Sequence, residues 1–194
     1  MANIDAPFGL RPAKTLGAGY NTSGFSTYKM ATGAGDNIFT GSLVMLQANG
    51  MITIAVDNTT ANILGVCGGF YYDNAQGEPT FGSYWPASTE TYNEADVEVK
   101  VYDDPNTLFE VQSVAGTTGQ AVIGANANSS GNANGSTTSG LSSCYIDAPN
   151  AAATAEQLRI VDVSADVDNK DLSSNNVNLV VRINEHAYTT LTGI

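Results

Sequence analysis

The chain has 194 residues and a formal net charge of −12, and charged residues make up only 13% of it. This length predicts one domain, and the shortage of Lys and Arg argues against direct nucleic-acid binding, because phosphate contacts require a basic surface. The sequence contains no apolar run long enough to cross a membrane and does not open with a signal peptide, so we expect folding in a cytoplasm.

Residues 1–24 predict an extended N-terminal arm. Pro7 and Pro12 disfavour helix in the residues before them, and the apolar side chains follow no period. Residues 1–30 hold three basic residues against Asp5 alone, whereas the rest of the chain holds four basic and eighteen acidic residues. This asymmetry indicates a separate task for the arm, such as lying across an acidic neighbour.

The elements after the arm have the pattern of β-strands. Two apolar runs, 42–47 and 51–56, flank Asn49-Gly50, a strong hairpin signal because a type I′ turn needs positive φ at both central residues. Residues 63–72 predict a third strand, in which Gly68-Gly69 marks a bulge or bend.

The segment 96–104 alternates apolar and polar residues, as expected of a half-buried strand with Val97, Val99 and Val101 on one face. A turn at Asp104-Pro105-Asn106 follows, and we expect 107–112 to be the partner strand. Further strands are predicted at 156–163 and near 177–184, whereas helical character is confined to 148–160. The last strand divides into one face with Val177, Leu179, Val181 and Ile183 and another with Asn178, Val180, Arg182 and Asn184.

These elements predict a mainly β fold, an antiparallel β-sandwich or barrel (jelly-roll-like) with long Gly/Asn/Ser loops, formed by residues 25–194 as one domain. The longest loop is 113–143, which lies in a region without Lys, Arg, Asp or Glu. We expect this neutral tract to be an ordered loop that crosses the domain, with a mobile tip at 129–135. Its neutrality would suit packing against copies of the same acidic protein.

Candidate catalytic and metal-binding residues are few. His186 is the only histidine, and no G-x-S-x-G motif accompanies it, so we expect no catalytic residue. Asp166, Asp168, Asn169 and Asp171 are dense in oxygen ligands, but their spacing fails the EF-hand pattern and favours a solvated acidic turn. The neutral tract lacks a phosphate-binding motif. We therefore expect no metal and no cofactor.

The two cysteines, Cys67 and Cys144, are expected to be free buried thiols, although spacing alone leaves their pairing open. The aromatic group of Tyr71, Tyr72, Tyr84 and Trp85 suits either sugar stacking or core packing, and we favour a place in the core or an interface.

Several segments, in this order, resemble one family of proteins. The opening MANIDAPFGLRP, the internal VYDDPNTLFEVQ, IGANAN, STTSGLSS and LRIVDV, and the closing NLVVRINEH resemble small virion proteins of tailed double-stranded-DNA bacteriophages that are regarded as capsid decoration (cement) proteins. The resemblance extends from about Ala2 to His186, and the order of the segments carries it rather than any single motif.

The resemblance implies a structural protein without enzymatic activity, made in the host cytoplasm and placed on the outer capsid surface of the virion. It implies a β-rich homotrimer whose partner is the major capsid protein, with no direct contact to nucleic acid or membrane. In this hypothesis the arm clasps the capsid by apolar anchoring, charge and strand addition, through Phe8, Leu10, Arg11, Pro12 and Lys14.

Two other hypotheses stay open at this point. One is a carbohydrate-binding or host-attachment module on the virion, in which Tyr71, Tyr72 and Trp85 stack on a sugar. The other is a hydrolase that uses His186.

Overall fold

The computed structural model describes residues 3–17, 24–31, 35–58, 62–86, 96–114, 119–146, 155–169, 171–173 and 175–189. Within these ranges the fold is mainly β, neighbouring strands of each sheet are antiparallel, and no sheet closes into a barrel. Among the described residues, η2 (Gly119–Val122) is a short 3-10 helix, and no described helix is long and apolar enough to span a membrane. The predicted antiparallel, sandwich-like β class is therefore confirmed.

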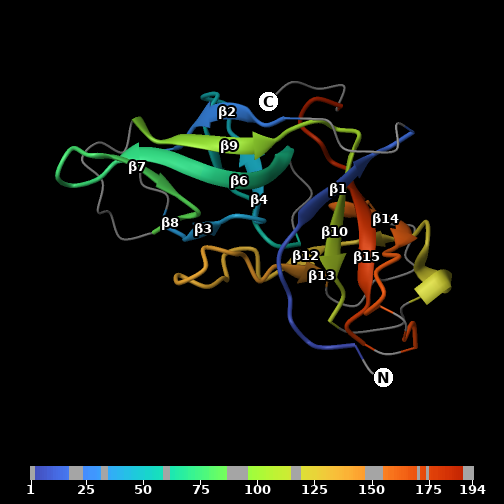
Figure 1. Cartoon of the computed structure of the whole chain (residues 1–194). Helices are drawn as coiled ribbons and strands as arrows, with labels where there is room; N and C mark the ends of the chain where they lie inside the picture. Colours follow the sequence, from blue (N-terminus) through green and yellow to red (C-terminus); the bar gives the residue numbers. More distant parts are fainter. Residues whose placement is uncertain are drawn as a thin grey trace.

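Two larger sheets organise the chain. The first, here called the β1 sheet, has the order β1 (Arg11–Thr15), β10 (Thr107–Gln112), β15 (Asn178–Ile183), β14 (Leu158–Val163) and β11 (Asn126–Ala127). The second, the β6 sheet, has the order β2 (Ser26–Lys29), β9 (Glu98–Tyr102), β6 (Ile63–Asp73), β4 (Leu43–Leu46) and β5 (Ile52–Ile54), with β7 (Pro79–Gly82) also paired to β6. In Figure 1, β6 and β9 run across the view, whereas β10 and β15 run down it.

Two short two-stranded sheets complete the described pairing. They join β3 (Ile38–Phe39) to β8 (Tyr84–Trp85), and β12 (Ser129–Ser130) to β13 (Tyr145–Ile146). The second of these lies within the region predicted as a loop. In the segment 148–160, for which the sequence predicts helical character, β14 begins at Leu158, and residues 148–154 lie outside the described part.

The two larger sheets share one apolar core. Leu43 and Val66 of the β6 sheet belong to the same buried cluster as Phe109 and Val181 of the β1 sheet. The alternation of the sequence explains this burial, because every second residue of a strand points to the same face. The predicted inward face of the last strand is confirmed, since its four residues are at most 2% exposed: Val177, Leu179, Val181 and Ile183.

A second buried cluster belongs to the β6 sheet and its neighbouring segments and includes Phe70, Trp85 and Val99. The strand β6 contributes to both clusters, with Val66 in the shared core and Cys67 in the second one. Burial on both faces explains why β6 has a nearly continuous apolar sequence. The predicted inward valines of β9 are likewise confirmed.

The predicted hairpin at Asn49-Gly50 exists, but its turn is not type I′. Gly50 has a φ of +77°, whereas the backbone of Asn49 does not have a positive φ. The N–H of Gly50 donates to the Gln47 carbonyl (2.9 Å), and the Asn49 side chain accepts the N–H of Met51 (2.9 Å). This is a longer hairpin loop that ends in a left-handed glycine, and the Asn49 side chain stabilises it.

The turn at Asp104-Pro105-Asn106 is confirmed, but the strands on either side of it are not partners. Thr107 donates its N–H to the Asp104 carbonyl, and Asn106 donates its N–H to the Asp104 carboxylate, each at 2.9 Å. However, β9 pairs with β2 and β6, while β10 pairs with β1 and β15. The expected pairing of 107–112 with 96–104 is wrong, because this turn carries the chain from one sheet to the other.

The glycines of β6 are required by close packing. The predicted bulge at Gly68-Gly69 is confirmed by a register shift against β9 and by a φ of +143° at Gly69. At Gly65 a Cβ atom would overlap the carbonyl oxygen of Tyr102 on the neighbouring strand. A side chain at this position would therefore force β6 and β9 apart.

The neutral tract is fastened to the β6 sheet by the side chain of Asn132, which is 1% exposed. Its Nδ2 donates to the carbonyls of Leu43 and Ala55, each at 2.8 Å, and its Oδ1 accepts the N–H of Leu43 at 2.7 Å. The carboxylate of Asp57 accepts the N–H groups of Gly131 and Asn132. These bonds support the prediction of an ordered loop.

The position of the predicted mobile tip needs correction. Within 129–135, both Ser129 and Asn132 are 1% exposed, and Ser129 donates its hydroxyl to Gln157 Oε1 at 2.7 Å. The exposed stretch of the tract is instead 133–139. Small polar residues at 129–132 serve as buried hydrogen-bonding groups, a role that a Gly/Asn/Ser composition does not distinguish from a flexible loop.

Candidate interaction surface

The described part of the predicted arm, residues 3–17, lies along the domain. Strand β1 pairs with β10 at the edge of the β1 sheet, and the N–H of Leu10 donates to the Gly41 carbonyl at 2.9 Å. Leu10 is 1% exposed and belongs to the shared core. Leu10 is therefore a core residue and not a partner-binding residue as predicted, and the arm in this part is an edge strand.

The outer edge of β1 is poorly suited to adding another strand. Pro12 has no N–H to donate, and the register of β1 shifts between Pro12 and Lys14. Lys14 lies 3.9 Å (Nζ to Oδ2) from Asp162, with both side chains about half exposed. Proline, lysine and a bulge are common protections of an edge strand, so β1 gives no support to the predicted clasp by strand addition.

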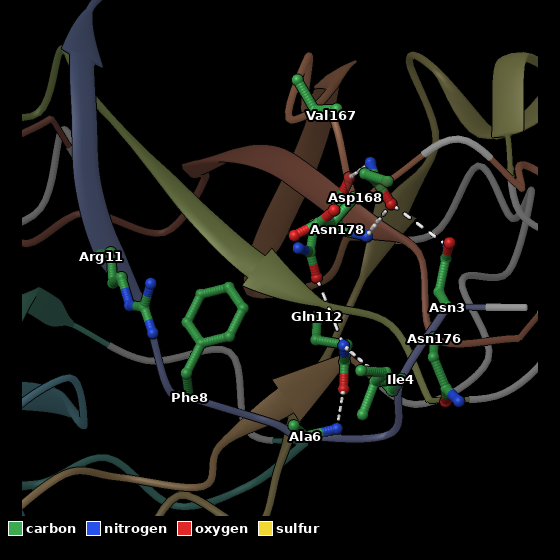
Figure 2. A pocket seen from close by; sticks show the side chains of 11 residues that line it. Asn3, Ile4, Ala6, Phe8, Arg11, Gln112, Val167, Asp168, Asn176 and Asn178 are labelled. Carbon is green, nitrogen blue, oxygen red and sulfur yellow. Dashed lines mark hydrogen bonds between the residues drawn. The ribbon is translucent and has the colours of Figure 1, made fainter. Parts of the chain in front are cut away.

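A groove of about 670 Å³ lies between the arm and the ends of β10 and β15 (Figure 2). Its lining is mostly amide and apolar side chains, with one basic residue, Arg11, and one acidic residue, Asp168. Figure 2 shows Phe8 and Arg11 on one side of the groove and Asn3 and Asn176 on the other. Of the five predicted partner-binding residues, the groove therefore brings together Phe8 and Arg11.

Gln112 sets the position of the arm against β10. This residue is 4% exposed, and its Oε1 accepts the N–H of Ala6 at 2.9 Å. Its Nε2 donates to the carbonyl of Ile4 at 3.0 Å and to Asn178 Oδ1 at 3.3 Å (Figure 2). A single amide thus replaces the strand pairing that the arm lacks before β1.

Asn169 forms the other wall of the groove. It is 5% exposed, and its Nδ2 donates to the carbonyls of Ser164 and Asn178 at 2.9 and 2.8 Å. The N–H of Asp168 donates to the Asp166 carboxylate, which confirms the predicted turn. Among the described residues, no group of His, Cys, Asp and Glu is arranged to hold a metal ion.

Phe8 and Arg11 form a cation–π pair at the mouth of the groove. The Arg11 Cζ lies 3.9 Å from the centroid of the Phe8 ring (Figure 2). Arg11 is exposed and makes no ion pair with any residue that the structure describes. An exposed guanidinium held over a ring is a typical interface contact, because its orientation is already fixed.

The outer face of the β1 sheet gathers four of the seven basic residues of the chain. Directly opposite residues on antiparallel strands share a face, and the register places Lys14 beside Leu108, Leu108 beside Arg182, and Arg182 beside Arg159. Arg11 lies on the same face, opposite Glu110. This face also carries Glu110 and Asp162, and its centre is covered, since Leu108 is 1% exposed, but basic residues outnumber acidic ones on it in a chain of net charge −12.

His186 lies where the chain passes from β15 to the β6 sheet, and it is 1% exposed. Its Nδ1 accepts the N–H of Tyr188 at 3.2 Å. Burial lowers the pKa of His186, although the nearby carboxylates of Asp103 and Asp104 oppose this effect. The geometry gives His186 a packing role between the sheets.

A hydroxyl–carboxylate cluster lies beside His186. The Tyr28 hydroxyl donates to Asp103 Oδ2 at 2.6 Å and lies 2.8 Å from the Tyr188 hydroxyl. Burial and the Asp103 hydrogen bond raise the pKa of Tyr28. The cluster connects β2, the end of β9 and the C-terminal segment.

The aromatic group predicted from the sequence is divided between core and surface. Trp85 is 3% exposed and packs edge-on against Tyr72, with 5.5 Å between the ring centroids, while Tyr84 stacks on Phe39. The preferred core interpretation is confirmed for Trp85. Tyr71 is 42% exposed, so it is the one member of the proposed sugar-stacking set that faces solvent substantially.

The two cysteines are free and buried, one in each apolar cluster. Burial raises the pKa of the Cys67 thiol to about 12 and raises that of Cys144 as well. The question left open by the sequence is answered, because the two thiols do not pair.

Two residues of this surface have no signal in the sequence, Gln112 and Arg159. Alternation does place Arg182 on the outer face, but its neighbour Arg159 is set by strand register, which the sequence does not reveal. Comparison of the chain with models of known families, with curated proteins and with solved structures finds no match.

Proposed function

We propose that the protein is a structural virion protein, a capsid decoration (cement) protein that binds the major capsid protein lattice from outside and acts as a homotrimer. The resemblance of its ordered sequence segments supports this function. The observation that carries the proposal in the structure is the outer face of the β1 sheet, which holds the groove lined by Arg11 and, beyond it, Lys14, Arg159 and Arg182 on an otherwise acidic chain.

Phe8 and Arg11 are the proposed contacts at the groove, with Pro12 and Lys14 beside them on β1. The exposure of Arg11, the partial exposure of Phe8, the guanidinium held over the ring and the adjoining groove support a preformed binding surface. The basic face of this otherwise acidic protein favours one orientation on an acidic lattice.

The test is co-sedimentation of the purified protein with parent-phage capsids assembled without it. The proposal predicts saturable binding in multiples of three copies per local symmetry axis, and weaker binding by the double variant F8A/R11A. A variant with the exposed aromatic of the other sheet removed, Phe81→Ala, is the matched control. Absence of binding by the wild-type protein to capsids at every maturation state would reject the proposal.

A second candidate function, a carbohydrate-binding or host-attachment module, is favoured by one observation. Tyr71 on β6 and Phe81 on β7 are directly opposite each other and are 42% and 67% exposed. Their rings form an apolar platform of the kind on which sugars stack. A glycan-binding screen of the wild-type protein and of Tyr71→Ala tests this candidate.

A further inference from the structure

Arg159 of β14 and Arg182 of β15 are directly opposite each other on the outer face of the β1 sheet. The Cβ atoms of such a pair lie about 5 Å apart, and like charges in this position destabilise a sheet. An acidic residue at either position would remove this repulsion. The arrangement is therefore unfavourable for the isolated chain.

The chain does not neutralise this pair. Arg159 donates its Nε to Asn126 Oδ1 at 3.1 Å, and neither arginine makes an ion pair with a carboxylate of the described residues. The Nε of Arg182 is buried without a hydrogen-bond partner. Buried donors are nearly always bonded in folded proteins, so this Nε has a hydrogen-bonding capacity that the described residues leave unused.

The other charged residues described on this face do not form ion pairs with Arg159 or Arg182. Asp162 lies 3.9 Å from Lys14, and Glu110, which is opposite Arg11 and Val180 in the register, makes no ion pair with a described residue. Arg159 is thus an exposed residue directly beside Arg182, which is partly buried and whose Nε is covered.

We propose that Arg159 and Arg182 form a receptor for the carboxylate groups of Asp or Glu side chains on a partner protein. This inference rests on the proposed function, because the partner is then an acidic surface of the capsid lattice. A guanidinium binds a carboxylate through two parallel hydrogen bonds, and two adjacent guanidiniums hold one or two carboxylates in a fixed orientation. A nucleic-acid backbone fits less well, because it requires many basic contacts along an extended surface, and this face also carries Glu110 and Asp162.

The test uses a dye-labelled hexaglutamate peptide and fluorescence anisotropy at low ionic strength. We compare the wild-type protein with the double variant R159Q/R182Q and with the control K29Q/K100Q, which loses the same charge from the β6 sheet. The expected result is saturable binding that weakens at least tenfold in R159Q/R182Q and changes less than twofold in the control. Equal binding by the two double variants, or no saturable binding by the wild-type protein, would overturn the proposal.

Two further measurements check the class of ligand and the folding of the variants. If inorganic phosphate displaces the peptide at lower concentration than acetate does, the carboxylate assignment is wrong. Thermal unfolding shows whether the variants fold, and the single variant Arg159→Gln, at an exposed position, serves if the double variant does not. We expect its Tm to equal or exceed that of the wild-type protein, since a like-charge contact is removed.

The same variants distinguish the receptor from the proposed function. Peptide binding that depends on the two arginines, together with no capsid binding by any form of the protein, would reject the capsid function alone. Capsid binding that R159Q/R182Q leaves unchanged would reject the receptor alone.

Discussion

The two larger sheets both carry basic side chains on an exposed face, but they treat them differently. On the β6 sheet, Lys29 lies 3.6 Å from Glu98, and Lys100 donates to the Thr27 hydroxyl at 3.1 Å while its Nζ lies 5.3 Å from the centre of the Phe25 ring. On the β1 sheet, Lys14 likewise lies 3.9 Å from Asp162, but Arg159 and Arg182 are opposite each other without an ion pair to any described residue.

The difference shows how a structural role and a binding role are distinguished within one fold. A charge that already has a partner within its own sheet gains little further interaction energy from a second protein. A pair of like charges that the sheet leaves unneutralised is stabilised most when a partner of opposite charge binds. The following predictions test whether the two sheets are one folding unit and whether only one of them binds.

The largest effect is expected at the connection between the sheets, in Asn132→Ala. This change leaves two buried carbonyls and one buried N–H of the segment Leu43–Ala55 without their partner, and we expect a loss of about 4 kcal/mol in the free energy of unfolding. Urea unfolding followed by Trp85 fluorescence and by circular dichroism should give one shared transition. Two separate transitions would show that the sheets unfold independently.

Leu10→Ala should lower the free energy of unfolding by about 3 kcal/mol, because Leu10 is buried in the core shared by the sheets. Phe8→Ala, two residues earlier and partly exposed, should cost about 1 kcal/mol or less. Urea denaturation of both variants measures the difference. Equal, small losses would show that the arm is not part of the core and would restore the extended-arm hypothesis.

Stability should decrease as the pH falls below the ordinary pKa of histidine. Burial lowers the pKa of His186 in the folded protein, so the unfolded chain binds the proton more readily, and stability is lost from about pH 6.5 down toward the folded pKa. Asp103 and Asp104 reduce this loss, whereas Arg182 increases it. Denaturation midpoints at pH 7.5 and 5.5 measure the effect, and His186→Gln should make the profile flatter over this range. If stability fell equally steeply with pH in His186→Gln, the loss of stability would come from carboxylate groups and not from His186.

The smallest effect is expected for single charge removals. Arg159→Gln should leave the free energy of unfolding unchanged or raise it by up to about 0.5 kcal/mol, because it removes a like-charge contact. Lys29→Gln should lower it by about 0.5 kcal/mol or less, because it removes an exposed ion pair with Glu98. Differential scanning calorimetry of both variants shows whether the free energy of unfolding rises or falls in each. A clear loss in Arg159→Gln would indicate that the arginine stabilises the sheet and is not reserved for a partner.

The sequence predicts the inward faces of β9 and β15 because their alternation is regular and the period of a strand is local. It also predicts the Gly68-Gly69 bulge and the Asp104 turn, which depend on the chemistry of neighbouring residues. The pairing of β9 with β2 and of β10 with β1 depends on contacts distant in the sequence, and for this reason the predicted hairpin across Asp104-Pro105-Asn106 is wrong.

The arm and the neutral tract are harder to predict, for a shared physical reason. Neither has periodic apolar residues, and each is fastened by single side chains, Leu10 and Gln112 for the arm and Asn132 for the tract. One buried amide has the same sequence signature as a residue of a flexible loop. The Arg159–Arg182 pair is not visible in the sequence because only the strand register brings these two residues together.

The most direct test of the central claim is a cryo-electron-microscopy map of parent-phage capsids decorated with the wild-type protein. The account predicts density in which the outer face of the β1 sheet, with Arg11, Arg159 and Arg182, lies against the capsid shell. A map in which this face points to solvent, or in which the exposed face of the β6 sheet contacts the shell, would contradict it.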